Sequence, residues 1–225
     1  MRILKDFKLP KFKFPKMKMK GISEIDEVKL DYEALKKAKE KGITISCDLN
    51  YRKKLWSRDK ACEVMSQLVP YVDVCIANEE DAADVFGISA KHTNIESGSL
   101  DYDAYCGVAR QISARFGCKK VAITLRGSIS ASRNTWAGML YDSASDSAYL
   151  SRTYDIQIVD RVGGGDSFGG ALIYALSSQY SDQEAIDFAV AASCLKHTIE
   201  FDFNQVSVSE VRALMSGSGS GRVQR

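Results

Sequence analysis

The stretch "DRVGGGDSFGGALIYAL", residues 160–176, places consecutive glycines between an apolar strand pattern and a long apolar helix pattern. The run "YDIQIVD", residues 154–160, precedes it, and Phe168, Ala171, Leu172 and Ala175 follow the spacing of one helix face. Successive backbone N–H groups at a helix N-terminus bind anions, and glycine lets the backbone approach them closely. Gly163, Gly164 and Gly165 are therefore predicted to hold an anion such as a phosphate, with the carboxylate of Asp166 beside it.

Three interpretations of this loop are open from its residues alone. The loop has neither the G-K-[ST] of a Walker loop nor the third glycine of a dinucleotide fingerprint. As a kinase site, Asp166 would accept a proton from a hydroxyl while the glycines stabilise the transferred phosphoryl group. As a hydrolase elbow, residues 165–169 match G-x-S-x-G, with Ser167 as nucleophile and His197 and Asp182 or Asp187 downstream. The third interpretation is a tight structural turn capped by Asp166.

Strand and helix patterns alternate on both sides of this loop. Asp31 is predicted to cap a helix that Gly42 ends, and Ser181 with Glu184 and Ser207 with Glu210 predict capping boxes. Further strands are predicted at 43–49, 72–77 and 119–125, helices at 59–69 and 101–116, and short strands with turns over 129–159. This alternation predicts a three-layer αβα domain with a mainly parallel sheet over residues 21–215. Ligands of such sheets bind beyond the carboxyl ends of the strands.

Composition predicts a cytoplasmic protein with a sizeable core. Hydrophobic residues make up 45% of the chain, and the six cysteines are far apart in sequence, as expected of reduced thiols. No apolar run is long enough for a membrane helix, and we identify no secretory signal.

Charge is concentrated at the N-terminus. Residues 1–20 form a lysine-rich arm in which Asp6 is the only acid, whereas the rest of the chain is net acidic. We expect this arm to be loose or an edge strand, with binding to an anionic surface as the alternative. The acidic body gives no reason to expect a nucleic-acid partner. Residues 216–225 are expected to form a flexible tail.

The glycine loop resembles the D-T-x-G-A-G-D signature of the ribokinase-like (PfkB) carbohydrate kinases. Further segments are similar to the branch that phosphorylates 2-keto-3-deoxygluconate. They are "CDLNYRKKLW" (47–56), "ANEEDA" (77–82), "VAITLRGSISASRNTWAGMLYD" (121–142) and "LKHTIEFDFNQVSVSEV" (195–211). Because they appear in family order from about residue 21 onward, they are more specific than any single motif.

The resemblance implies ATP and Mg²⁺ as cofactors and a sugar acid as the small-molecule substrate. A homo-oligomer is expected as well, because a sheet edge left exposed without the family's first strands favours self-association. The resemblance also implies that Asp166 is the catalytic base and that Gly163, Gly164 and Gly165 form the anion hole. It implies that Asn78 and Asp81 help to hold magnesium and that Arg52 binds the sugar-acid carboxylate. Asn50, Thr124, Leu125 and Arg126 would lie beside ATP.

Departures from the family pattern set a further expectation. The family has a long segment ahead of this region that supplies the first strands, the lid and a sugar-binding glycine pair, and the lysine-rich arm does not match it. We therefore expect an intact nucleotide half and a chain whose turnover is slow or lost. A non-catalytic nucleotide-binding or dimerising protein remains the alternative, and local alternatives also stay open. Asn78 could be only a helix cap, Arg52 part of a solvated face, and His197 a structural histidine.

Overall fold

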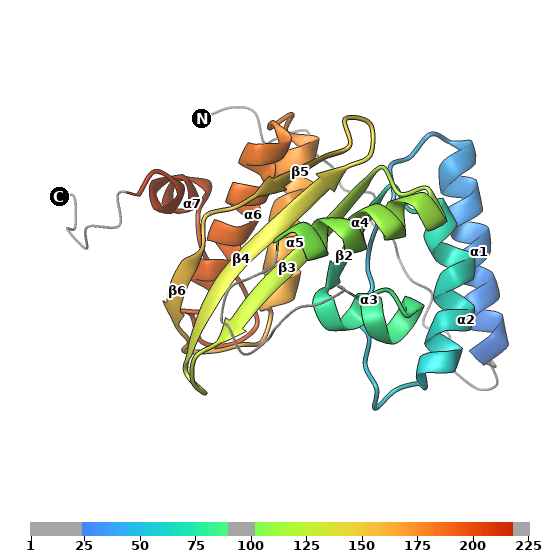
Figure 1. Ribbon diagram of the computed structural model, residues 1–225, viewed down its shortest axis with the longest axis horizontal. Coiled ribbons are helices and arrows are strands. Elements are labelled where there is room, and N and C mark those ends of the chain that lie inside the picture. Colours follow the sequence, from blue (N-terminus) through green and yellow to red (C-terminus); the bar gives the residue numbers. More distant parts are fainter. Residues whose placement is uncertain (1–23, 90–101, 218–225) are drawn as a thin grey trace, which may run out of the picture.

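The computed structural model describes residues 24–89 and 102–217. The arm predicted at residues 1–20 and the tail beyond residue 217 lie outside the described residues. Figure 1 shows the described chain as a twisted sheet with helices packed on both of its faces.

The sheet has six strands in the order β1-β2-β3-β4-β5, and β6 pairs with the other half of β4. The strands are β1 Ser46–Asp48, β2 Val74–Asn78, β3 Lys120–Ser128, β4 Arg133–Asp142, β5 Ser147–Leu150 and β6 Tyr154–Gln157. β1, β2 and β3 are parallel, and β4 runs antiparallel to β3, β5 and β6. All strands except β4 therefore share one direction, which confirms the predicted mainly parallel sheet.

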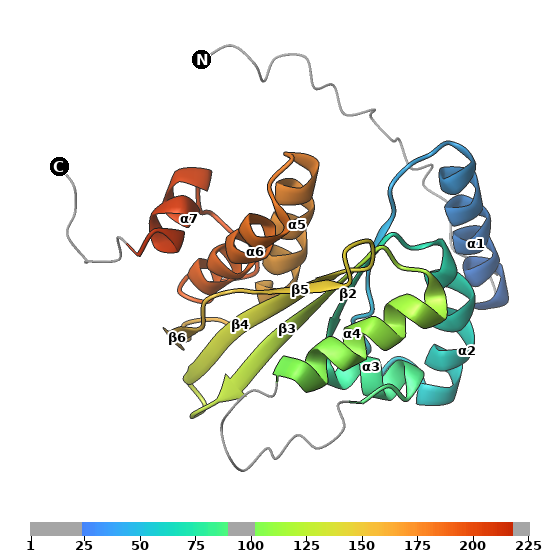
Figure 2. The same ribbon diagram turned by 45° about the horizontal axis from the view of Figure 1, so that its top comes forward.

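Helices form the two outer layers, as Figure 2 shows in side view. They are α1 Glu24–Glu40, α2 Arg58–Leu68, α3 Glu79–Phe86, α4 Tyr102–Phe116, α5 Gly164–Ser177, α6 Asp182–Lys196 and α7 Val208–Met215, with a short 3₁₀ turn η1 at Val69–Tyr71. Residues of α2, α3 and α4 pack against one face of the sheet, while α5, α6 and α7 pack against the other. The three-layer architecture is the one predicted.

The central strands divide the core into two halves. In β2, Cys75 and Ala77 face the layer of α2, α3 and α4, whereas Val74 and Ile76 face the layer of α5 and α6. This alternation follows from the two-residue period of a strand, and burial on both faces requires an almost wholly apolar sequence. Because the interior of β2 is apolar, the polar residue of this strand, Asn78, stands at its carboxyl end.

Two local predictions near β1 were wrong. Helix α1 begins at Glu24, so Asp31 lies inside the helix and does not cap it, although Gly42 beyond its end has the expected positive φ of 67°. The strand expected over 43–49 is only Ser46–Asp48, since the Ile45 N–H donates to the carboxylate of Asp73 instead of a strand carbonyl.

Other local predictions are confirmed. Both capping boxes form, at Ser181 with Glu184 and at Ser207 with Glu210. All six cysteines are free thiols. Among the helices of the described ranges, none combines the length and apolar character needed to cross a bilayer.

Candidate active site

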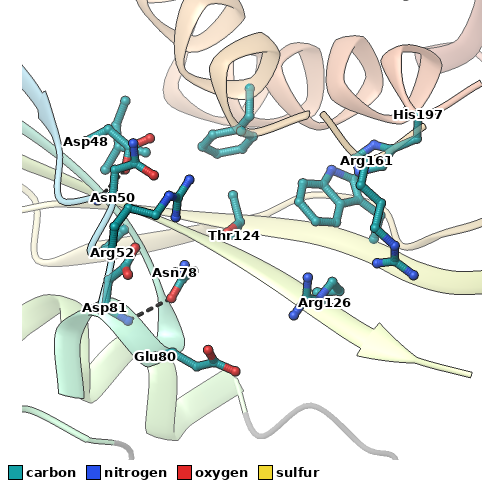
Figure 3. A pocket seen from close by; sticks show the side chains of 15 residues that line it. Asp48, Asn50, Arg52, Asn78, Glu80, Asp81, Thr124, Arg126, Arg161 and His197 are labelled. Carbon is teal, nitrogen blue, oxygen red and sulfur yellow. Dashed lines mark hydrogen bonds between the residues drawn. The ribbon is translucent and has the colours of Figure 1, made fainter. Parts of the chain in front are cut away.

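A cavity of about 230 Å³ lies at the carboxyl ends of β1, β2 and β3, beside the N-terminus of α5. This is the edge at which ligands bind in open α/β sheets. The site residues predicted from sequence that line it are Asn50, Arg52, Asn78, Asp81, Thr124, Arg126 and Gly165. In Figure 3 the acidic and amide side chains occupy one side, and Arg126, Arg161 and His197 occupy the other.

The turn after β1 places Arg52 at the cavity. The Asn50 N–H donates to Asp48 Oδ1 at 3.1 Å, and Asn50 adopts a φ of 39°, which asparagine tolerates better than most residues. The chain then turns, and the Arg52 guanidinium extends toward the interior of the cavity (Figure 3). The pKa of the Asp48 carboxyl is raised overall. Burial is the main cause, the negative charge of Asp166 adds to it, and the hydrogen bond from the Asn50 amide partly offsets both.

Asn78 and Asp81 connect β2 to helix α3. Asn78 is the N-cap of α3, and its Oδ1 accepts from the Asp81 N–H at 2.7 Å, drawn as the dashed line in Figure 3. Asp81 Oδ1 in turn accepts from the Tyr51 N–H at 3.2 Å. Asp81 is 5% exposed, and burial raises the pKa of its carboxyl to about 6. The helix-cap role of Asn78 is thus present, and a metal role for either residue stays a prediction.

The glycine turn has the backbone geometry predicted for it. Gly163 is the N-cap of α5 with a φ of 76°, so Gly164 and Gly165 form the first turn of the helix. A Cβ at Gly163 would lie 2.1 Å from the Asp202 carbonyl oxygen, and one at Gly164 would lie 2.7 Å from the His197 ring. The Ser193 hydroxyl also donates to the Gly164 carbonyl at 2.7 Å. The Asp202 carbonyl and the positive φ leave room only for glycine at Gly163.

Asp166 lies in the first turn of α5, and its side chain is exposed. It lines a second, more apolar groove with Gly163 and Ser167, next to the cavity that Gly165 lines. The candidate base therefore does not line the cavity itself. Gly163 lines the groove with it, whereas the predicted residues that line the cavity are Asn50, Arg52, Asn78, Asp81, Thr124, Arg126 and Gly165.

Thr124 and Arg126 point into the cavity, but the intervening Leu125 does not. Leu125 is fully buried on the opposite face of β3, among the residues packed under α4. The alternation of a strand requires this, so only the backbone of Leu125 is available beside a nucleotide.

The far wall of the cavity is built from His197 and Trp136. Their rings lie 4.8 Å apart, and His197 Nδ1 is 2.7 Å from the Ser193 carbonyl, to which it donates in the neutral form. Burial lowers the pKa of His197, which favours that neutral form. The Trp136 Nε1–H is buried and has no hydrogen-bond partner among the described residues. His197 thus has the structural role considered from sequence while also lining the cavity.

The hydrolase arrangement does not form. The Ser167 hydroxyl accepts from Asn204 Nδ2 at 2.5 Å, whereas His197 bonds to Ser193. The candidate acids are engaged elsewhere, Asp182 with Lys120 and Asp187 with Gln183. A nucleophilic serine needs a base within hydrogen-bond reach, and these side chains make other contacts.

Among the side chains that line the cavity and carry a polar group, Asp48, Glu80, Trp136 and Arg161 were not predicted from sequence. Asp48 could have been found, because it ends a strand at the same edge of the sheet as Asn78. Trp136 and Arg161 could not, since they reach the cavity only through the antiparallel pairing of β3 with β4 and the turn before α5.

The oxygen-bearing side chains at the cavity suit a magnesium ion whose remaining ligands are waters and phosphates. Asp48, Asn78, Glu80 and Asp81 bring carboxylate and amide oxygens to one side. Within residues 24–89 and 102–217, however, no three histidine, cysteine or acidic side chains cluster as a metal cage. Mg²⁺ in phosphate sites is commonly bound by one or two carboxylates together with waters and phosphates, and the donor set fits that pattern.

Residues 23–198 match the pfkB family of carbohydrate kinases. The chain belongs to this family. It is 30% identical to a 2-dehydro-3-deoxygalactonokinase of Haloferax volcanii, over 84% of this chain and 52% of the relative. Its structure matches that of a 2-dehydro-3-deoxygluconokinase from Thermotoga maritima with a TM-score of 0.78 and 46% identity, over 84% of this chain and 55% of the other.

The same fold extends to more distant pfkB-type structures. A putative ribokinase II from E. coli, in complex with ATP and Mg²⁺, matches with a TM-score of 0.61 and 20% identity, over 86% of this chain and 54% of that one. The chain therefore has a ribokinase-like fold and spans about half the length of the relatives it matches.

Proposed function

We propose that this chain forms the nucleotide-binding part of an ATP-dependent kinase for a 2-keto-3-deoxy sugar acid. The observation that carries the proposal is the turn at Gly163–Gly165, whose N–H groups begin α5 beside a cavity lined by Arg52, Arg126 and Arg161. A helix N-terminus and nearby guanidinium groups both favour phosphate oxygens.

The proposed reaction is phosphoryl transfer to a hydroxyl of the sugar acid. The hydroxyl oxygen forms a bond to the γ-phosphorus as the bond from that phosphorus to the β,γ-bridging oxygen breaks, which releases ADP. The hydroxyl proton passes to the Asp166 carboxylate. The N–H groups of the glycine turn stabilise negative charge on the transferred group, because they are already oriented by the packing of Gly163 and Gly164.

Asn78 and Asp81 are the residues that would hold Mg²⁺, together with the nucleotide phosphates and the nearby carboxylates of Asp48 and Glu80. The ion supplies positive charge that neutralises the phosphates when it is bound. Asp81 can serve in this role only when it is ionised, and its pKa of about 6 leaves it ionised at neutral pH.

The substrate class rests on the two relatives named for 2-dehydro-3-deoxy sugars and on Arg52. A planar guanidinium binds a carboxylate through two parallel hydrogen bonds. Arg52 extends into the cavity from the turn after β1, opposite Arg126 and Arg161 (Figure 3). We assign the sugar-acid carboxylate to Arg52 and the nucleotide to the side that carries Arg126 and Arg161.

Isothermal titration of this chain with ADP and Mg²⁺, followed by an ADP-release assay with 2-keto-3-deoxygluconate, tests the proposal. We expect nucleotide binding that weakens when Arg126 is replaced by glutamine. A matched control is Arg133→Gln, because Arg133 bonds to Asp155 on the surface and does not line the cavity. Absence of nucleotide binding, or equal binding by both variants, would refute the site.

A further inference from the structure

Lys196 is a lysine that the proposed reaction does not use, yet its side chain is fully buried. It is the last residue of α6, with 0% of its surface exposed, and it is not part of the cavity lining. Its ammonium group donates to the Ile199 carbonyl at 3.1 Å. Burying an ammonium ion is costly unless nearby negative charge compensates it, so its position requires an explanation.

The carboxyl end of α6 supplies negative potential at this ammonium, because the helix dipole favours a cation there. Asp160, in the turn that leads to the glycine loop, is a second negative charge of this region. The pKa of the Asp160 carboxyl is lowered first by the Val162 amide and further by the Phe201 amide and the charge of Lys196.

Asp160 connects two turns that are far apart in sequence. Its Oδ1 accepts from the Val162 N–H at 2.9 Å in its own turn, and its Oδ2 accepts from the Phe201 N–H at 2.9 Å in the turn after α6. The N–H groups of Val159 and Asp160 also both donate to the His197 carbonyl, at 2.8 and 3.3 Å. Residues 159–162 are thus held directly against residues 197–201.

The contact between residues 159–162 and residues 197–201 extends to the glycine turn that begins at Gly163. Gly163 packs on the Asp202 carbonyl so closely that a Cβ would be 2.1 Å from that oxygen. Phe201 adopts a φ of 65°, a conformation that costs a phenylalanine free energy and persists only where its surroundings impose it. The position of the Gly163 backbone therefore depends on how the turn after α6 is folded.

We propose that Lys196 is a positioning residue, whose buried ammonium holds the turn after α6 against Asp160 and so orients the N–H groups of Gly163, Gly164 and Gly165. The ammonium fixes the Ile199 carbonyl, and the Phe201 N–H of the same turn donates to the Asp160 carboxylate. Loss of this charge frees the two turns to separate. The effect on nucleotide binding rests on the proposed function, whereas the effect on the turns does not.

The test compares Lys196→Met, which keeps the length of the side chain and removes the charge, with Lys196→Arg, which keeps the charge. Amide hydrogen exchange is measured across residues 159–165 and 197–203, together with ADP affinity in the presence of Mg²⁺. We expect exchange in both turns to rise about ten- to a hundredfold in Lys196→Met, the scale of one lost charged hydrogen bond. We expect ADP binding to weaken and Lys196→Arg to recover part of both effects.

Lys120→Met is the matched control. Lys120 is also partly buried and contacts Asp142 and Asp182, at 2.9 and 2.7 Å, near the other end of β3. This variant should lower the melting temperature without selective exchange at the two turns.

Wild-type exchange at both turns in Lys196→Met, or a uniform rise over the whole chain, would overturn the inference. If the wild-type chain binds no nucleotide, the proposed function fails, and the exchange pattern still decides the role of Lys196.

Discussion

The buried carboxylate of Asp81 accepts a hydrogen bond from the backbone N–H of Tyr51 at 3.2 Å and so joins helix α3 to the turn after β1. Asp81 also follows Asn78, which caps the same helix. One carboxylate therefore fixes two of the segments that form the cavity. The carboxylate is buried, and burial disfavours its charged form, so its pKa is raised to about 6 from the ordinary value of 3.8.

Asp81→Asn is predicted to stabilise the fold at neutral pH. A carboxyl whose pKa is raised on folding binds more protons in the native state, so its charge destabilises the protein progressively as pH rises between about 4 and 6. Asparagine keeps an oxygen for the Tyr51 N–H and removes the charge, and we expect a gain of about 1–3 kcal/mol at pH 7. Thermal melts of both proteins at pH 7 and at pH 3.5 provide the measurement.

The gain in Asp81→Asn should shrink toward zero at pH 3.5, where both the native and unfolded wild type are protonated. An equal difference at both pH values would show that the charge of Asp81 does not act on stability. The same variant is expected to weaken binding of Mg²⁺ with ADP, because an amide is a poorer ligand for the ion.

The glycine turn gives a graded prediction for three alanine variants. Gly163→Ala should be the most damaging, by about 2–4 kcal/mol, since it combines a positive φ with a Cβ 2.1 Å from a backbone oxygen. Gly164→Ala requires only a shift of the His197 ring, and a Cβ at Gly165 meets nothing within 4 Å. Urea denaturation should rank the three in that order, and a different order would contradict the packing of this turn.

The sheet and its helices were predictable because they follow local rules, and most of the site was predictable from the family resemblance. Short apolar runs identified β2 and β3, capping boxes located α6 and α7, and the resemblance pointed to Asn78, which lines one cavity with Gly165. The approach of Trp136 and Arg161 was not predictable, because it depends on the register of β3 with β4 and on tertiary packing. The early start of α1 was missed as well, since Asp31 has the residue type of a cap but not its position.

Arg52 is predicted to determine affinity for the sugar acid without affecting the nucleotide. Its guanidinium donates only weakly to the Tyr51 carbonyl, at 3.4 Å, so it is free to bind a carboxylate. Arg52→Lys should raise KM for 2-keto-3-deoxygluconate by about tenfold or more, because lysine cannot form two parallel hydrogen bonds. ADP affinity should stay within about twofold. A matched loss of both affinities would place the nucleotide, and not the sugar acid, at Arg52.

Asp166→Asn is predicted to abolish most phosphoryl transfer while leaving nucleotide binding nearly unchanged. Asp166 is exposed in the first turn of α5, next to the glycine N–H groups. Asparagine preserves the shape of this side chain but cannot accept the proton of the attacking hydroxyl, and a positioned base contributes about 10²–10⁴-fold to the rate. ADP release with and without sugar acid, and ADP affinity by titration, are measured for both proteins.

Ser167→Ala is the control for this prediction, since Ser167 neighbours Asp166 and contacts Asn204 instead of the cavity. A kinase that uses Asp166 should keep its turnover in Ser167→Ala, whereas a serine hydrolase would lose its activity entirely. Wild-type turnover in Asp166→Asn would show that the proton passes elsewhere. Asp48, whose carboxylate lines the cavity, would then be the residue to replace next.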